Sequence, residues 1–160
     1  MKGFILYRSY YGNTRQVAEA IAAGLTSAGH ETAAQGLDQK LPDAAGADFV
    51  MVGSPTRFKG VNGKALRVIR KLAKKGFADK PFAVFDTFGP VPADPAELEK
   101  GRAWLYPGAE GRLRKTAENA GLHVFEETLR CEVTGMNGPL KDETLTDAAA
   151  FAKKFAASLK

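Results

Sequence analysis

The sequence contains few of the residues from which disulfide-rich and cysteine-dependent proteins are built. Cys131 is the one cysteine among 160 residues, which excludes an internal disulfide framework and favours a cytoplasmic location. No histidine stands in a candidate site loop, so Cys131 is expected to be a buried apolar residue rather than a nucleophile. The two histidines, His30 and His123, each begin a predicted strand, and no metal site is expected.

Long apolar runs are also missing. None approaches the roughly 18 residues that a membrane span requires, so no membrane span is expected. The first residues pass directly into Phe4-Ile5-Leu6-Tyr7 and lack the length and the cleavage site of a secretory signal. Two phosphate-binding fingerprints are absent as well. There is no Gly-x-Gly-x-x-Gly, and the Gly-Lys pair at 63–64 lacks the glycine and the Ser or Thr that would make it a P-loop.

The composition that remains is that of a soluble globular protein. Hydrophobic residues make up 44% of the chain and charged residues 26%, and the length suits a single domain over residues 1–160. The net charge is +5. Such a balance can indicate nucleic acid, an anionic membrane surface or an acidic partner, or it can serve solubility alone. We expect no nucleic-acid binding.

Short apolar runs alternate with segments of helical periodicity. The runs predict strands at 4–7, 30–34, 49–52, 82–85 and 123–133. Helices are predicted at 14–28, 64–75 and 113–120, and around Phe151, Phe155 and Leu159. Because the central runs are continuous rather than alternating, both faces of the sheet should be covered. The pattern therefore predicts an α/β fold with a single, doubly wound, five-stranded parallel sheet.

Three loops follow the carboxyl ends of the predicted strands, at 8–14, 53–63 and 86–108. In an open α/β sheet, ligands bind beyond these ends, where the strand order reverses. The third loop is predicted to be irregular from residue 89 to residue 108 and contains four prolines. Loops of this length are typical of lids or binding surfaces.

The first loop has the features of an anion site. Ser9 and Thr14 offer hydroxyls, Gly12 allows a close approach of the backbone, and Asn13 opens a helix. Unpaired amides and the positive end of the helix dipole would bind a phosphate monoester without a lysine. The same residues are also ordinary helix caps and turn formers, so this loop alone leaves both interpretations open.

The second loop carries a resemblance to a known family. Gly53-Ser54-Pro55-Thr56-Arg57-Phe58, together with Gly63, is similar to the isoalloxazine-binding loop of flavodoxin-like NAD(P)H:quinone oxidoreductases. Ser9-x-Tyr11-Gly12 resembles the same group, while Gly12-Asn13-Thr14 also resembles flavodoxins proper. The resemblance weakens beyond residue 90, where Thr87 to Pro92 replaces a Gly-rich loop. It implies a flavodoxin-like fold with strand order 2-1-3-4-5, and FMN as cofactor.

The resemblance also implies the contacts that FMN would make. It implies phosphate contacts from Ser9, Tyr10, Gly12, Asn13 and Thr14, ring contacts from Pro55, Thr56, Arg57, Phe58 and Lys59, and closure of the other side of the flavin by Thr87, Phe88 and Gly89. Tyr11 would help to orient cofactor or substrate. The candidates for stacking on the flavin are Phe58, Phe88, Trp104 and Tyr106. No catalytic side chain is required, because the cofactor carries the redox chemistry.

The expected function is electron transfer through FMN, with an NAD(P)H:quinone oxidoreductase using the same site as the alternative. For the carrier, the expected partner is a redox protein, which an acidic surface would suit. For the reductase, the expected partners are NAD(P)H and a quinone. The oligomeric state is left open. Between Arg57 and Lys80 the sequence has nine basic residues and one acidic residue. A solvated helix face explains this most simply. The sharper interpretation is docking of an acidic redox partner, or attraction of a phosphorylated nicotinamide, near the flavin edge. Flavodoxins proper are usually acidic, so the basic segment departs from them.

Overall fold

The computed structural model describes residues 1–57 and 62–159, whose strands form a five-stranded parallel sheet in the order β2-β1-β3-β4-β5. The strands are β1 (Lys2–Tyr7), β2 (Glu31–Gly36), β3 (Phe49–Pro55), β4 (Phe82–Phe88) and β5 (Leu129–Glu132). Every pairing between neighbours is parallel. The predicted fold class and strand order are therefore confirmed.

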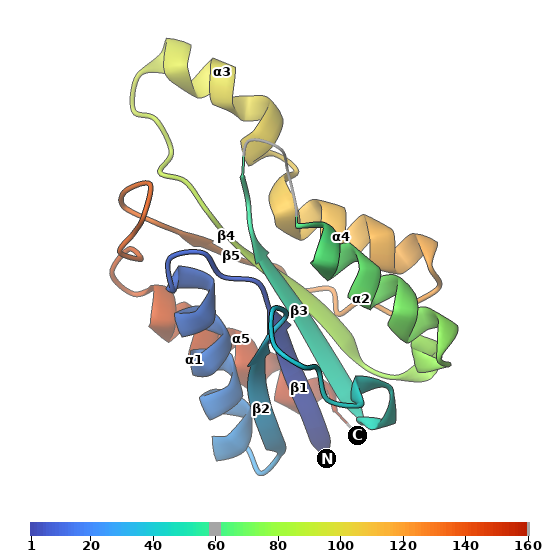
Figure 1. The fold of residues 1–160 in the computed structure, drawn as a ribbon. Coiled ribbons are helices and arrows are strands. Elements are labelled where there is room, and N and C mark those ends of the chain that lie inside the picture. Colours follow the sequence, from blue (N-terminus) through green and yellow to red (C-terminus); the bar gives the residue numbers. More distant parts are fainter. Residues whose placement is uncertain (58–61, 160) are drawn as a thin grey trace.

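Helices cover both faces of the sheet (Figure 1). On one face lie α1 (Asn13–Ser27) and α5 (Thr144–Ser158), and on the other lie α2 (Gly63–Lys74) and α4 (Gly108–Asn119). The remaining helix, α3 (Pro95–Leu105), projects beyond the carboxyl end of β4. None of the described helices combines the length and the apolar character that crossing a membrane requires.

The core is divided into two layers by the sheet, as a doubly wound fold requires. Along β3, Met51 packs toward α1 and α5, whereas its neighbours Val50 and Val52 pack toward α2 and α4. Side chains alternate between the faces of a strand, and here both faces are apolar because both are covered by helices. This explains why β3 and β4 are continuous apolar runs in the sequence.

Two expectations about the second half of the chain are wrong. Residues 89–108 are not wholly irregular, because α3 forms within them. Asp94 caps this helix by accepting a 3.1 Å hydrogen bond from the Glu97 amide, and Pro95 occupies its first turn. The prolines are therefore compatible with a helix here, since proline is favoured at the first helical position.

The expected strand at 123–133 is reduced to Leu129–Glu132. Val124 forms a single bridge to Phe82 and does not extend the strand. The carbonyl of Phe125 accepts a 2.9 Å hydrogen bond from Arg114 of α4, so a side chain satisfies this backbone group in place of a sheet ladder. The same helix begins at Gly108, five residues before the predicted start at Leu113.

Candidate functional site

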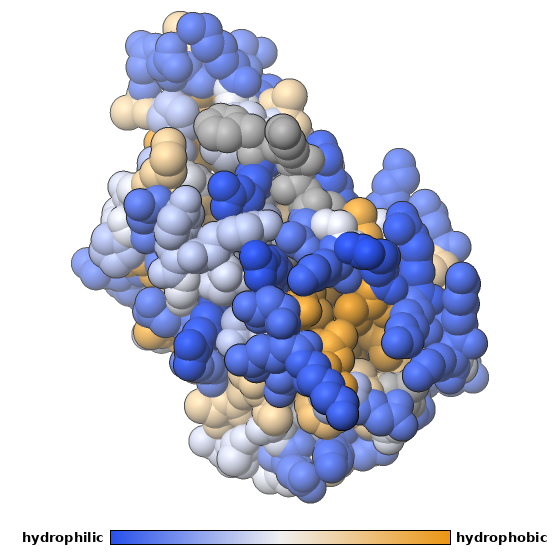
Figure 2. All heavy atoms as spheres, in the orientation of Figure 1, coloured by the Kyte–Doolittle hydropathy of each residue, from blue (hydrophilic) through white to orange (hydrophobic). Residues whose placement is uncertain are grey.

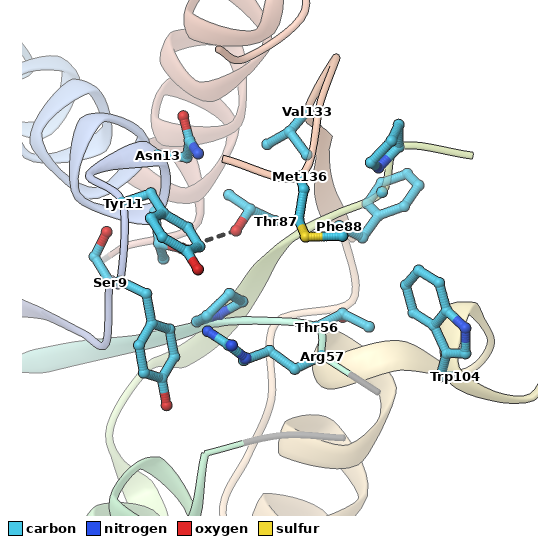
Figure 3. A pocket seen from close by; sticks show the side chains of 15 residues that line it. Ser9, Tyr11, Asn13, Thr56, Arg57, Thr87, Phe88, Trp104, Val133 and Met136 are labelled. Carbon is cyan, nitrogen blue, oxygen red and sulfur yellow. Dashed lines mark hydrogen bonds between the residues drawn. The ribbon is translucent and has the colours of Figure 1, made fainter. Parts of the chain in front are cut away.

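A cavity of about 290 Å³ opens at the carboxyl ends of β1, β3 and β4 (Figure 3). It lies where the strand order reverses between β1 and β3, the position at which open α/β sheets bind ligands. All three predicted loops contribute to its wall. The residues that line it are Ser9, Tyr10, Tyr11, Asn13, Thr14, Pro55, Thr56, Arg57, Thr87, Phe88, Gly89, Pro90, Trp104, Val133 and Met136.

One end of the cavity is formed by the amino terminus of α1. Gly12 precedes the helix with a left-handed φ of 89°, and apart from its two chain neighbours no described residue has a heavy atom within 4 Å of the position that a Cβ would take. The glycine is therefore required for its conformation rather than for space. The first amide bonded within the helix is that of Gln16, which donates to the Gly12 carbonyl at 3.0 Å. The amides of Asn13 and Thr14 precede that bond and are the groups that a helix end offers to an anion.

Ser9 organises this helix end. Its Oγ accepts hydrogen bonds from the amides of Gly12 at 3.1 Å and of Arg15 at 3.3 Å. A hydroxyl that accepts two bonds still has its proton to donate. Ser9 is therefore a structural cap whose hydroxyl proton remains available to a ligand in the cavity.

The side chains of Asn13 and Thr14 are directed to the protein itself. Asn13 Nδ2 donates to the Asn137 carbonyl at 3.2 Å, which attaches the segment after β5 to α1. Thr14 Oγ1 and Thr87 Oγ1 share a buried 2.8 Å hydrogen bond, the dashed line in Figure 3. These bonds fix the spacing between the first and third loops. For Thr14, the backbone amide is then the better donor for an anion.

The ring of Tyr10 lies against two arginines at the rim of the cavity. The Arg57 Cζ lies 4.1 Å from the ring centroid and the Arg8 Cζ 4.5 Å, which are cation–π distances. Asn62 Nδ2 donates to the Tyr10 hydroxyl at 2.8 Å. Partial burial raises the pKa of Tyr10, but the hydrogen bonds from Arg8 and Asn62 and the two arginine charges outweigh it, so this pKa lies below its ordinary value. Arg8 also pairs with Asp38 at 3.6 Å, whereas Arg57 forms no ion pair within the described residues, so the net positive charge of the rim comes from Arg57.

The other end of the cavity is apolar. Phe88, Trp104, Val133 and Met136 converge there from β4, from α3 and from the segment after β5 (Figure 3). Met136 is 75% exposed, so this end is open to solvent. Sequence reasoning missed Pro90, Val133 and Met136. The rule that ligands bind at the carboxyl ends of strands, applied to β5 as well, would have found the last two.

A buried ion pair lies behind the cavity wall. Asp86 is fully buried, and Arg130 donates to its carboxylate from Nη2 at 2.9 Å and from Nε at 3.0 Å. The same carboxylate accepts bonds from the Thr56 hydroxyl at 2.7 Å and from the Glu110 amide at 3.1 Å. The guanidinium also lies 4.3 Å from the Phe88 ring centroid. This cluster attaches the second loop, β5 and the start of α4 to β4.

Most of the residues predicted for the site meet at this cavity. Those that line it are Ser9, Tyr10, Tyr11, Asn13, Thr14, Pro55, Thr56, Arg57, Thr87, Phe88 and Gly89. Gly12 shapes the loop without lining the cavity, and Phe58 and Lys59 lie outside the described residues. Trp104 lines the cavity, whereas Tyr106 does not. The ring centroid of Tyr106 lies 5.6 Å from the Arg130 Cζ. That these residues contact FMN stays a prediction.

The remaining reactive groups lie away from the cavity. Cys131 is 2% exposed within the core, as predicted. Burial is the main cause that raises the pKa of its thiol from 9.0 to about 12. Within residues 1–57 and 62–159, no three His, Cys, Asp or Glu side chains gather closely enough to hold a metal ion.

Comparison with known proteins identifies the fold and its family. A family model described as a flavodoxin domain matches residues 4–125, which is most of the chain. The chain belongs to the flavodoxin family. No curated protein sequence matches it.

Solved structures agree with the family model. A flavodoxin from the domain Archaea superposes with a TM-score of 0.77 at 20% identity, covering 99% of this chain and 98% of that one. Oxidised flavodoxin 1 from Bacillus cereus superposes with a TM-score of 0.73 at 22% identity, covering 100% of both chains. The Flv1 flavodiiron core from Synechocystis sp. PCC6803 superposes with a TM-score of 0.76 at 23% identity, covering 99% of this chain and 36% of that chain. Identities this low show the fold alone.

FMN is the cofactor of the flavodoxin family, and the cavity suits it. FMN has a charged phosphate at one end and a flat, largely apolar ring at the other. The cavity has the same polarity, with the amino terminus of α1 at one end and Phe88 and Trp104 at the other. A volume near the lower limit of the roughly 300–1,000 Å³ usual for ligand pockets, together with an open apolar end, suits a ligand that stays partly exposed.

Proposed function

We propose that the protein is an electron carrier that binds FMN in this cavity and exchanges electrons with a redox partner protein. The observation that carries the proposal is the polarity of the cavity, which has a helix amino terminus at one end and aromatic walls at the other. The phosphate would bind the amides of Asn13 and Thr14 and the Ser9 hydroxyl. The ring would lie between the segments 55–57 and 87–89.

The protein's contribution in this role is binding and orientation. FMN, when bound, supplies the reversible uptake of one or two electrons. Ser9 and the start of α1 would fix one end of the ligand, and Phe88 and Trp104 would contact the flat ring at the other, open end. Arg57 places positive charge at the rim, which favours the reduced, anionic form of a flavin and so raises its reduction potential.

The absorption spectrum of the purified protein tests this function. We expect flavin bands in the visible region and release of one FMN per chain on denaturation. Stepwise anaerobic reduction with dithionite should bleach the bands, and air should restore them. A colourless protein that takes up no added FMN would contradict the proposal.

A second candidate is an NAD(P)H:quinone oxidoreductase, which the open apolar end of the cavity favours. Trp104 and the exposed Met136 offer a surface on which a planar acceptor could stack. NAD(P)H would supply two electrons and the quinone would leave as the hydroquinone. Anaerobic mixing of the FMN-loaded protein with NADPH separates the two. Rapid bleaching of the flavin bands by NADPH and steady turnover with a benzoquinone support the reductase. Flavin bands that NADPH does not bleach support the electron carrier.

A further inference from the structure

One line of basic side chains runs along α2, and we call it the α2 stripe: Lys64, Arg67, Lys71 and Lys74. Their spacing of three, four and three residues places them on one side of the helix, over about 15 Å. All four are exposed, whereas Ala65, Ile69 and Leu72 are the buried residues of the helix.

The stripe is not neutralised by acidic neighbours. None of its four cations forms an ion pair within the described parts of the chain. The contrast with α3 is direct, because Lys100 pairs there with Glu97 and Arg102 with Glu99, each at 3.2 Å. On α3, neighbouring glutamates thus neutralise the exposed basic side chains. The four cations of the α2 stripe have no such glutamate or aspartate partner among the described residues.

Helix stability does not explain the stripe either. Lys71 and Lys74 lie in the last turn of α2, where the helix dipole favours positive charge. Lys64 lies at the opposite end, where the dipole disfavours it, and the first turn has no acidic residue to offset it. The basic end near the site therefore weakens the helix.

The stripe begins at the rim of the candidate FMN cavity. Asn62 caps α2 by accepting a 2.9 Å bond from the Lys64 amide, and it also donates to the Tyr10 hydroxyl at 2.8 Å. Tyr10 and Arg57 line the cavity. Figure 2 shows that the hydrophilic side chains over α2 border an apolar hollow on the same face of the molecule. The core cluster of this face includes the partly buried Phe4 and Leu66.

We infer that the α2 stripe is the docking surface for the electron-transfer partner, and that the partner presents a strip of carboxylates flanked by apolar side chains. This inference rests on the proposed function, since docking at the rim brings the partner close to the flavin. The cations are spread along a helix and do not converge on one point, which does not suit a single phosphate. The adjoining apolar hollow suits apolar side chains of a protein. A nucleic-acid backbone is charged and would gain nothing from an apolar surface.

A charge-reversal experiment with a matched control tests the inference. Arg67→Glu with Lys71→Glu alters the stripe, and Lys153→Glu with Lys154→Glu makes the same change of four charges on α5, on the other face of the sheet. Lys154 also loses its 3.5 Å ion pair with Glu127, so the control is the more disruptive of the two changes. The probe is a fluorescently labelled, acidic [2Fe–2S] ferredoxin, with binding followed by anisotropy at several salt concentrations. Duplex DNA serves as the competing probe.

We expect the stripe variant to bind the ferredoxin about tenfold or more weakly and to lose most of the salt dependence, with the α5 variant within about twofold of the unaltered protein. Equal weakening in both variants, unchanged binding in the stripe variant, or tighter binding of DNA than of ferredoxin would overturn the inference. An FMN titration of the same variants keeps the two proposals separate. Intact FMN affinity without stripe-dependent docking removes only this inference, whereas absent FMN affinity in the unaltered protein removes the proposed function.

Discussion

Asp86 is the residue on which the geometry of the site depends most. Its buried carboxylate accepts hydrogen bonds from Arg130, from Thr56 and from the amide of Glu110, which belong to three different segments. Removing one partner of a buried ion pair leaves an uncompensated charge behind, and that penalty is larger than the value of the pair itself. Arg130, with a 16% exposed side chain, would be that charge.

Asp86→Ala is therefore expected to lower the free energy of unfolding by about 3–5 kcal/mol. Glu118→Ala on the exposed side of α4 is the control and should change it by no more than about 0.5 kcal/mol. Denaturant-induced unfolding followed by circular dichroism measures both. A loss below about 1 kcal/mol for the Asp86 variant would show that the ion pair does not support the fold.

Cys131 gives a prediction about pH. Burial raises the pKa of its thiol from 9.0 to about 12, so the folded protein keeps the thiol neutral where an unfolded chain would ionise. Because the folded pKa is the higher one, the contribution to stability is complete below pH 9 and is lost as the pH rises from 9 toward 12.

At pH 8 we expect the native thiol to be nearly inert to a disulfide reagent and one thiol to react in denaturant. Above pH 9 the free energy of unfolding should fall more steeply for the unaltered protein than for Cys131→Ala. A thiol that reacts fully and at once in native buffer would show that Cys131 is not buried as described.

At the scale of elements, α3 distinguishes the site. It projects from the sheet, and its only buried residues are Gly101 and Leu105 (Figure 1). The helix places the partly buried side chain of Trp104 in the wall of the cavity. The third loop thus gains a second aromatic side chain at the cavity, in addition to Phe88 of the Thr87–Gly89 segment.

Trp104 is the one tryptophan of the chain, so its fluorescence reports on this wall. We expect FMN to quench the emission with one-to-one stoichiometry. Trp104→Leu should raise the Kd for FMN by about two- to tenfold, which corresponds to about 0.5–1.5 kcal/mol for an aromatic contact. Trp104→Phe should recover part of the loss. Emission that does not respond to saturating FMN would place Trp104 outside the binding site.

The elements differ in how well the sequence predicts them. β3 and β4 are continuous apolar runs and α1 has a clear helical stripe, because burial dictates both patterns. The helix α3 buries little and has no such stripe. Its signal is local, in Asp94, Pro95 and Glu97, a capping residue and a first-turn proline that the surrounding prolines obscured. Around Phe125, an arginine from α4 takes the place of a strand partner, which no local pattern reveals.

At the scale of the whole molecule, the site is assembled from segments far apart in the chain. The first two loops are recognisable because each carries its own turn residues and follows a clear strand. The Asp86–Arg130 pair joins residues 44 positions apart, and the bond from Asn13 to Asn137 spans 124. Such pairings depend on strand order and register, so the residues that support the cavity become visible only once the sheet is built.

The central claim is that the amino terminus of α1 binds the phosphate of FMN. Titration of the flavin-free protein with FMN and with riboflavin, which lacks the phosphate, tests it most directly, with Ser9→Ala as the companion variant. We expect one FMN per chain, riboflavin bound about 100-fold or more weakly, and a preference for FMN reduced about tenfold in Ser9→Ala, because charge-assisted hydrogen bonds contribute about 1.5–3 kcal/mol each. Equal affinity for the two flavins, or binding of neither, would contradict the claim.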